Sequence, residues 1–516
     1  MSNCTTFLDV NRRFGDKTAI VQPTTGHSYS YRELFATVNR VGNGLRKIGI
    51  GPGERICIHL DSSPDYVICY LAIWRIGAVA VPVNIALTEE EVRYAVTNAG
   101  AAAIITDAGG CGAAERIRGR APSVRHIVCT GTGGSAGTVP WDAILAAPPE
   151  LRAAFCAGDT VCQLQYTSGT TGNPKGAMLT HANWMAALDA GGEVLGLCSD
   201  DVYLGIYPMA HVGVSWGISA LKAGATWVVM ERFDPEAYIR LVPESGATVV
   251  ASMPPVIHSL SLSPPGTEEA FAGTRIMISG GGPLHPSIWK TFHERFGIPV
   301  ANAYGLSETI VVGTGTAIRP EDYATAEDFR SVGHPVGYSE VTIVDTDDPT
   351  IELPPGETGE IALRGPSVAS GYWQMPDETN AVFLPEGWFL TGDIGYLDSS
   401  GMLAITDRKK DMIVMSGWKV YPTEVEKVLM EHPKIRDIAV FGIPDEHRGE
   451  IPVAAVVPAA GVEFLHEELV EYARERLAGY KIPRRTVILR DLPRVGGWKL
   501  LRRELRDRFG AISRRE

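Results

Sequence analysis

The sequence predicts an α/β protein with a large N-terminal domain of layered α/β subdomains and a small, mobile α+β C-terminal domain. The chain has 516 residues, more than one hydrophobic core usually serves. Up to residue 305, helical stripes of apolar residues alternate with short apolar runs, which is typical of a largely parallel sheet covered by helices. After the charged run 407–411 the order of elements changes, which indicates an independent domain of about one hundred residues.

The N-terminal elements follow from the spacing of apolar residues. These recur at steps of four and three over 29–49 and then alternate over 56–60, which predicts a helix followed by a strand. The next predicted elements are helix 63–76, strand 78–83, helix 88–99 and strand 102–106, and the same alternation resumes over 181–305.

The pattern changes twice in the last third of the chain. Between about 330 and 400, alternating strands such as 341–345 and 359–365 are separated by Asp- and Pro-rich turns, which predicts a small β subdomain. The charged run 407–411 is compatible with an exposed turn as well as with a domain boundary. After it we predict helix 423–431, strands 437–442 and 452–457, and helix 464–477.

Composition narrows the range of partners. The 47 basic and 60 acidic residues give a formal charge of −13, which opposes nonspecific binding to nucleic acid or to anionic membranes. All eight cysteines precede residue 200, without a CxxC pair or a His cluster at metal spacing, so neither a disulfide framework nor a zinc site is indicated. A signal-peptide pattern is not visible and the apolar stretch 66–74 stops at Arg75, so we expect a cytoplasmic protein without a membrane span.

A glycine-rich stretch at 166–178 reads YTSGTTGNPKGAM. An apolar run before it predicts a strand, and the residues from 178 onward predict a helix. Backbone N–H groups of glycines, hydroxyls and the cation of Lys175 suit a polyphosphate, although the composition alone favours an ordinary solvated turn. The spacing does not match Walker A, so a different nucleotide chemistry is indicated.

Five further stretches decide between these readings, namely SGGGPL (279–284), NAYGLSET (302–309), WFLTGD (388–393), DRKKDMIVMSGWKVYPTEVE (407–426) and LPRVGGWKLLRREL (492–505). With the glycine-rich stretch they follow the order and approximate spacing of the adenylate-forming (AMP-binding) superfamily, and the resemblance covers nearly the whole chain. Within this superfamily the chain resembles the acyl-CoA synthetases. The resemblance implies an AMP-forming acid–thiol ligase that uses ATP and Mg²⁺ to convert a carboxylic acid to acyl-AMP and pyrophosphate, and then transfers the acyl group to coenzyme A.

The resemblance also implies the domain limits and the nucleotide-binding residues. Residues 1–407 would bind ATP and the acid, 408–410 would form a hinge, and 411–516 would swing between the two half-reactions. Ser307 would contact the α-phosphate, Glu308 would hold Mg²⁺ and Tyr304 would stack on adenine. The β- and γ-phosphates would be held by Thr167, Ser168, Gly169, Thr170, Thr171, Gly172 and Lys175, and the nucleotide and acyl group would be lined by Gly280, Gly281, Gly282, Asn302 and Gly305.

The remaining implied residues lie mainly near the C-terminus. Asp393 would bind both ribose hydroxyls and Arg408 would hold ribose and phosphate. Lys410 would be the hinge residue, and Lys499 would neutralise the approach of the carboxylate to the α-phosphate. The family usually has glycine before that lysine, where this chain has Trp498. His211 lies where the family places an aromatic or His gate beside the acyl pocket, but a half-buried His at a strand end fits equally well.

Three alternative functions are compatible with parts of the sequence. An adenylating enzyme that loads a carrier protein remains the alternative, although an amino-acid substrate would need an acidic residue that 211–217 lacks. An acyl-AMP ligase that stops at the adenylate would carry an insertion, but 371–393 is compact. Glu308 and Lys499 argue against a noncatalytic nucleotide sensor. We expect the substrate to be a monocarboxylic acid with an uncharged aliphatic chain or ring, and Trp184, Trp216 and Val312 to lie near its pocket. The sequence leaves open whether the protein forms a homodimer.

Overall fold

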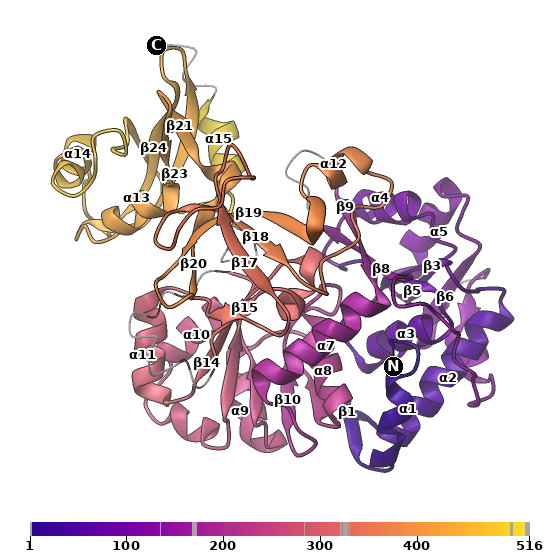
Figure 1. Cartoon of the computed structure of the whole chain (residues 1–516). Coiled ribbons are helices and arrows are strands. Elements are labelled where there is room, and N and C mark those ends of the chain that lie inside the picture. The colour runs from indigo at the N-terminus through magenta and orange to yellow at the C-terminus, as the bar shows by residue number, and fades with distance from the viewer. Residues whose placement is uncertain are drawn as a thin grey trace. The chain divides into compact units, whose positions relative to one another are not determined.

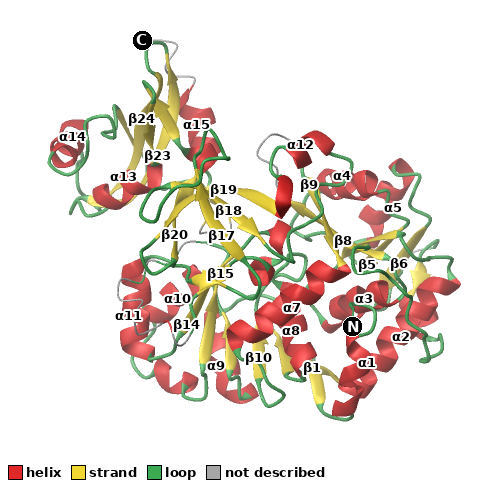
Figure 2. Cartoon of the chain, in the orientation of Figure 1, coloured by secondary structure: helices red, strands yellow, loops and turns green. Residues whose placement is uncertain are grey.

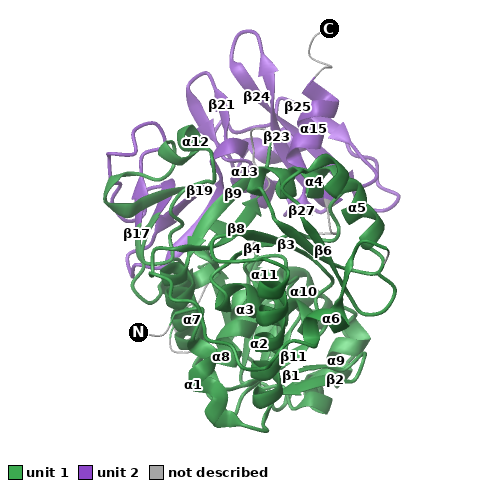
Figure 3. Cartoon of the chain, turned by 90° about the vertical axis from the view of Figure 1, so that its right-hand side faces the viewer, with its two compact units in different colours: residues 1–341, 363–390 green, residues 342–362, 391–516 purple. Residues whose placement is uncertain are grey.

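The computed structural model describes residues 3–134, 136–167, 173–282, 284–319, 322, 329, 331–495 and 499–510. Two compact units divide the chain, one formed by 1–341 with 363–390 and the other by 342–362 with 391–516 (Figures 1 and 3). Helices and strands alternate along most of the chain (Figure 2), so the predicted α/β class is confirmed. Among the described residues, no helix combines the length and apolar composition needed to cross a membrane.

The first sheet has seven strands in the order β7-β6-β5-β3-β4-β8-β9. All neighbours are parallel except β8 and β9. Its strands are β3 (Arg55–His59), β4 (Val79–Pro82), β5 (Ala103–Asp107), β6 (His126–Thr130), β7 (Val139–Pro140), β8 (Val161–Thr167) and β9 (Lys175–Thr180), and its helices are α3 (Pro64–Arg75), α4 (Glu89–Ala99), α5 (Cys111–Arg120) and α6 (Trp141–Leu145).

The second sheet has nine strands in the order β16-β15-β14-β13-β12-β10-β11-β1-β2. The run from β14 to β1 is parallel and both edges are antiparallel. The strands are β1 (Thr18–Gln22), β2 (His27–Ser30), β10 (Val202–Gly205), β11 (Thr226–Val229), β12 (Val249–Ala251), β13 (Ile276–Ser279), β14 (Val300–Tyr304), β15 (Thr316–Ala317) and β16 (His334–Pro335), and the associated helices are α1 (Phe7–Asn11), α2 (Tyr31–Lys47), α7 (His181–Leu195), α8 (Val214–Ala223), α9 (Pro235–Ser245), α10 (Pro254–Ser261) and α11 (Pro286–Phe296).

Helices between the two sheets join them into one hydrophobic core. Helix α3 is buried along its length except at Asp65, and its apolar side chains belong to the same core as side chains from both sheets, α7 and α8. Trp184 of α7 donates from its indole nitrogen to Gln163 of β8 at 2.6 Å and its ring lies 4.8 Å from that of Trp74. The buried side chain of Gln163 thus has a hydrogen-bond partner on the neighbouring helix, as burial of polar groups requires.

The last part of the chain contains a four-stranded and a five-stranded sheet, in agreement with the predicted β subdomain and α+β domain. The former has the order β17-β18-β19-β20, and the division between the two units passes through its strands. The bounds are β17 (Glu340–Val344), β18 (Gly359–Arg364), β19 (Trp388–Leu397), β20 (Leu403–Arg408), β21 (Ile413–Met415), β22 (Trp418–Val420), β23 (Ile435–Asp445), β24 (Gly449–Pro458), β25 (Arg485–Ile488), β26 (Arg494–Val495) and β27 (Lys499–Leu500), with α12 (Pro376–Asn380), α13 (Pro422–Leu429), α14 (His466–Arg474) and α15 (Arg502–Gly510).

Short 3₁₀ helices complete the fold, namely η1 (Arg12–Phe14), η2 (Thr267–Phe271), η3 (Ser307–Thr309), η4 (Val311–Gly313), η6 (Pro385–Gly387) and η7 (Lys409–Asp411). The division into units does not fall at residue 407, and the hinge at 408–410 stays a prediction.

The predicted helix after the glycine-rich stretch is wrong in its first residues. Strand β9 pairs antiparallel with β8, and Thr167 pairs with Lys175. Helix α7 begins only at His181, where Thr180 and Asn183 form a capping box, an arrangement that fixes a helix start. The stretch therefore joins the two strands of a hairpin, and not a strand to a helix.

Candidate functional site

Two neighbouring parallel strands end beside one another in the nine-stranded sheet. Ser279, the last residue of β13, pairs with Asn302 of β14. Gly280–Gly282 therefore follow β13 at the same sheet edge at which Gly305–Glu308 follow β14. Gly281 has a φ of 80°, which favours glycine. The carboxyl ends of adjacent parallel strands are where open α/β sheets bind ligands.

Glu308 lies in a cluster with Tyr372 and Lys175. The Tyr372 hydroxyl donates to Oε1 of Glu308 at 2.8 Å, and Nζ of Lys175 lies 5.1 Å from the centroid of the Tyr372 ring. Glu308 is only 7% exposed. Burial, reinforced by the charge of Glu308, raises the pKa of Tyr372, so the phenol stays protonated and donates to the carboxylate.

The segment 369–373 brings this cluster together through its backbone. Tyr372 forms an isolated bridge with Ala177 of β9, and Trp373 donates its N–H to the carbonyl of Gly176 at 2.8 Å. On the other side, Ala369 donates to the carbonyl of Glu308 at 2.8 Å. The segment thus holds β9, which carries Lys175, beside η3, which carries Glu308.

The residues directly after Glu308 have a strained backbone. Ile310 and Val311 have φ values of 51° and 52°, which β-branched residues rarely adopt. A Cβ at Gly305 would lie 1.7 Å from the carbonyl oxygen of Val311, so a side chain there would displace this turn. Hydrogen bonds from the Val311 N–H to the carbonyl of Leu306 and from the Thr314 N–H to that of Thr309, both 3.1 Å, hold it in place.

The structure places the other predicted nucleotide residues of this unit as follows. Thr167 closes the β8–β9 hairpin opposite Lys175, whereas Ser168, Gly169, Thr170, Thr171 and Gly172 lie outside the described residues. Ser307 begins η3 and is half-buried, and Tyr304 is buried at the end of β14. Asn302 is buried and donates to the carbonyl of Ser331 at 3.2 Å, so its side chain fixes a neighbouring segment.

His211 lies on the loop after β10, and its side chain is exposed. Its Nε2 is 3.1 Å from Nδ2 of Asn84, and Gln165 of β8 donates to the carbonyl of Ala210 at 3.1 Å. These contacts hold the loop against the strand that leads to Thr167. Trp184, Trp216 and Val312 are all buried in the hydrophobic core, so the structure does not expose them as pocket walls.

The predicted ribose-binding residues lie together in the other unit. Asp393 of β19 pairs with Arg408 of β20, and Nε of Arg408 is 2.8 Å from the Asp393 carboxylate. Asp393 is buried, while half of the Arg408 side chain is exposed. The adjacent Asp407 accepts from the N–H of Thr423 at 2.8 Å, and burial raises the pKa of its carboxyl.

The predicted hinge and catalytic lysine also lie in that unit. Lys410 is the middle residue of η7, and Arg506 of α15 donates to the carbonyls of Lys410 and Asp411 at 3.0 and 3.1 Å. Lys499 pairs with Val495 in the β26–β27 hairpin, directly before α15. The side chain of Lys499 and the whole of Trp498 lie outside the described parts of the chain.

Sequence analysis missed Tyr372, Asn84 and Arg506. Tyr372 and Arg506 contact the predicted residues only through tertiary structure, 64 and 96 positions away in the sequence. Local sequence patterns therefore do not indicate Tyr372 and Arg506, which are identified only by their contacts in the folded chain.

Comparisons with known proteins identify the family of this chain. A family described as AMP-binding enzyme matches residues 7–373, and AMP-binding enzyme C-terminal domain matches 424–497. A feruloyl-CoA synthase of Amycolatopsis sp is 34% identical over 94% of this chain and 95% of its own, and 4-coumarate–CoA ligase 3 of Oryza sativa subsp. japonica is 33% identical over 96% and 90%. The crystal structure of ATP-bound MatB from Rhodopseudomonas palustris is similar with a TM-score of 0.89 and 29% identity, over 99% of this chain and 100% of that chain.

Proposed function

Because the chain belongs to the AMP-binding enzyme family, we propose that it activates a carboxylic acid with ATP as acyl-AMP and then transfers the acyl group to coenzyme A. The observation that carries the proposal is the cluster in which Tyr372 donates to the buried carboxylate of Glu308 and Lys175 lies over the ring of Tyr372. The names of its relatives, a feruloyl-CoA synthase and a 4-coumarate–CoA ligase, support the same reaction.

The chemistry explains why a cation and an acidic residue lie together. A carboxylate must attack the α-phosphate of ATP, so two anions have to approach and pyrophosphate has to leave. Lys175 supplies positive charge beside Thr167 at the hairpin that would hold the phosphates. Glu308 offers the hard oxygen ligand that Mg²⁺ prefers, and Tyr372 orients it. Bound Mg²⁺ would neutralise phosphate charge during the transfer.

The second unit supplies the remaining groups. A buried carboxylate such as Asp393 suits two ribose hydroxyls, and its ion pair with Arg408 would orient it for the nucleotide. We assign Lys499 to the adenylation half-reaction and Lys410 to the hinge, on the motifs that contain them.

For the acid we propose a monocarboxylate with an uncharged chain or ring. A Cβ at Gly281, after β13, would meet nothing within 4 Å, so there is open space at this position, and 211–217 provides no acidic partner for an ammonium group. The aromatic acids in the names of two relatives place ferulate and 4-coumarate first in a panel to be tested. A missing methylene should lower kcat/KM by roughly 10–200-fold, so close homologues should still be substrates.

The function is tested by acid-dependent pyrophosphate release with and without coenzyme A. The proposal expects release with ferulate, 4-coumarate or aliphatic monocarboxylates, and formation of the acyl-CoA when coenzyme A is present. If acyl-AMP accumulates and reacts only with a carrier protein, the carrier protein and not coenzyme A is the acyl acceptor. Release that requires an amino acid or a dicarboxylate would overturn the proposed substrate class.

Tyr372→Phe should weaken the use of Mg²⁺ without preventing folding. It removes the hydrogen bond that orients Glu308, and loss of such an outer partner of a metal ligand typically costs about 10–100-fold in metal affinity or activity. We therefore expect the Mg²⁺ concentration for half-maximal pyrophosphate release to rise, with much of kcat restored at saturating Mg²⁺. The measurement is a Mg²⁺ titration of the initial rate.

The matched control is Tyr238→Phe, which removes a buried phenol hydrogen bond to the carbonyl of Ala251. It should leave the Mg²⁺ titration unchanged. An equal shift in both variants, or none in Tyr372→Phe, would contradict the positioning role of Tyr372.

His211→Trp should shorten the longest acid accepted if His211 borders the acyl pocket, because the larger ring fills space beside the exposed loop. The measurement is kcat/KM over a series of acids of increasing length. Asn84→Ala is the control, since it removes the His211 contact but not the imidazole. A chain-length profile unchanged by His211→Trp would remove His211 from the acyl site.

A further inference from the structure

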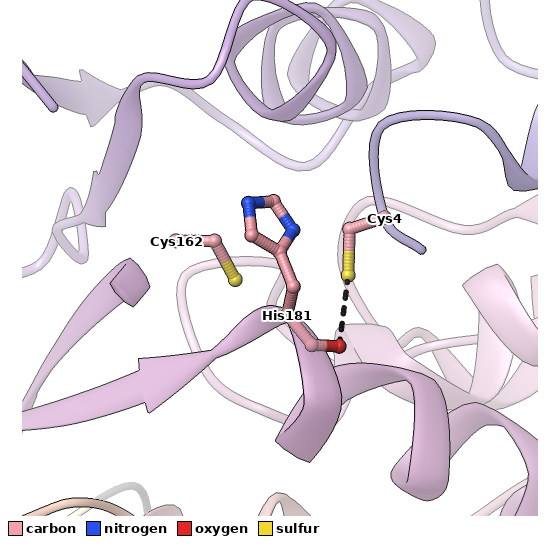
Figure 4. Close-up of side chains that lie close together, drawn as sticks. All are labelled: Cys4, Cys162 and His181. Carbon is pink, nitrogen blue, oxygen red and sulfur yellow. Dashed lines mark hydrogen bonds between the residues drawn. The ribbon is translucent and has the colours of Figure 1, made fainter. Parts of the chain in front are cut away.

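Three side chains far apart in the sequence meet in the interior of the first unit, away from the Glu308 cluster (Figure 4). They are Cys4, just before α1, Cys162 of β8, and His181, the first residue of α7. One ligand atom of each, two Sγ and an imidazole nitrogen, lies within 4.8 Å of the others. Cys4, Cys162 and His181 are 3%, 0% and 1% exposed.

The imidazole of His181 lacks the contacts that a buried histidine normally has. Both Nδ1 and Nε2 are buried without a hydrogen-bond partner among the described residues. Leaving a buried polar group unsatisfied costs about 1–3 kcal/mol, so most buried polar side chains have a partner. Figure 4 shows the ring between the side chains of Cys162 and Cys4.

Cys156, which is half-buried, is the candidate for a fourth ligand, because its backbone is tied to the residue before Cys4. Nδ2 of Asn3 donates to the carbonyl of Cys156 at 3.1 Å, and Sγ of Cys4 donates to the carbonyl of His181 at 3.5 Å. These bonds hold the three segments together.

We propose that Cys4, Cys162 and His181 bind one zinc ion, with Cys156 as the fourth ligand. Three thiolates and one imidazole form a common ligand set of structural zinc sites. Zinc bonds of about 2.3 Å to sulfur and about 2.0–2.1 Å to nitrogen put tetrahedral ligand atoms about 3.5–3.8 Å apart. The ligand atoms of Cys4, Cys162 and His181 lie within 4.8 Å of one another, so they need to approach by about 1.0–1.3 Å at most. On binding, Zn²⁺ replaces the thiol protons, which pass to solvent.

Sequence spacing does not reveal this site. Cys4 and His181 are 177 positions apart, and the ligands do not form a short motif. The ion would connect the segment before α1 to β8 and to the start of α7. Its role would be to stabilise the first unit, independently of the proposed reaction.

The test uses the full-length protein, reduced and stripped of metal with a chelator. Zn²⁺ is titrated against a chromophoric indicator, bound metal is counted by elemental analysis, and Co²⁺ is substituted to record its absorption spectrum. We expect one ion per chain, thiolate-to-Co²⁺ charge-transfer bands with the d–d bands of a tetrahedral site, and a Tm that rises with Zn²⁺.

Variants separate this site from adventitious binding. Loss of a group that hydrogen-bonds to a metal ligand lowers metal affinity by about 10–100-fold. Cys162→Ser and His181→Ala remove ligands themselves, so they should weaken Zn²⁺ binding by more than this. Cys156→Ser should change the Co²⁺ spectrum. Cys57→Ser, at a buried cysteine of β3 outside the cluster, is the control and should bind like wild type. If Cys162→Ser fails to fold, the wild-type spectrum and the half-buried Cys156 position still decide.

Two results would overturn the proposal. One is a wild-type protein that binds neither Zn²⁺ nor Co²⁺ stoichiometrically. The other is bound Co²⁺ that shows no thiolate bands or is retained equally by the Cys162, His181 and Cys57 variants.

Discussion

Lys499→Ala should reduce acyl-AMP formation by a factor on the order of 10²–10³, the usual loss when one preorganised charge-stabilising group is removed. The reason is that the ammonium group would neutralise the approach of the carboxylate to the α-phosphate. Thiolysis of supplied acyl-AMP by coenzyme A should remain nearly intact, because the thiolate attacks the acyl carbonyl carbon and not the charged α-phosphate, and AMP leaves. Single-turnover assays of each half-reaction measure the two effects separately.

Arg503→Ala is the matched control, because it removes a nearby positive charge whose side chain is 81% exposed. Surface ion pairs contribute little, so both half-reactions should proceed as in wild type. Equal losses in the two half-reactions of Lys499→Ala would exclude a role limited to adenylation, and so would an equal effect of Arg503→Ala.

Lys410→Pro should still form acyl-AMP but stall before the thioester. Proline fixes φ near −65°, and a hinge residue has to absorb a large dihedral change. The carbonyl of Lys410 accepts from Arg506 of α15, and Lys499 directly precedes this helix in the β26–β27 hairpin. A proline that prevents rotation of the backbone at residue 410 would therefore also prevent movement of the hairpin that carries Lys499. Accumulated acyl-AMP and a loss of overall turnover are the measured outcomes.

Lys410→Ala separates the backbone from the charge, since alanine removes the ammonium group but leaves φ free. It should retain overall turnover. Wild-type turnover by Lys410→Pro, or an identical defect in Lys410→Ala, would mean that Lys410 is not the hinge.

Local patterns were sufficient to predict most of the fold. Steps of four and three predicted a helix over 29–49, and α2 covers Tyr31–Lys47; the β subdomain and the final α+β domain are also confirmed. The error after the glycine-rich stretch has a physical cause. Buried Ala177 and Leu179 flank the half-buried Met178 in strand β9. This alternation is too short to be recognised in the sequence, because the apolar pattern of the following helix begins within it. Only the pairing with β8 identifies the strand.

The site was predictable in its motifs but not in its supporting contacts. Glu308 and Lys175 lie in recognisable stretches, whereas their link through Tyr372 depends on the pairing of 369–373 with β9. The same limit applies to Cys4, Cys162 and His181, which converge only because α7 and the segment before α1 pack against β8. Sequence separation hides such clusters, because residue types and not distances are visible in a single sequence.

The left-handed backbone at Ile310 and Val311 has a thermodynamic consequence for this protein. Such conformations cost on the order of 1–3 kcal/mol per residue, a sizeable share of the net stability of a typical domain. The turn persists because Gly305 admits the Val311 carbonyl and hydrogen bonds on both sides enforce it. Glycine at residue 310 would relieve the strain but lose the side chain of Ile310, which is only 1% exposed, and truncation of a buried isoleucine costs about 2–5 kcal/mol. The burial of this side chain therefore offsets the strain of the turn that follows Glu308.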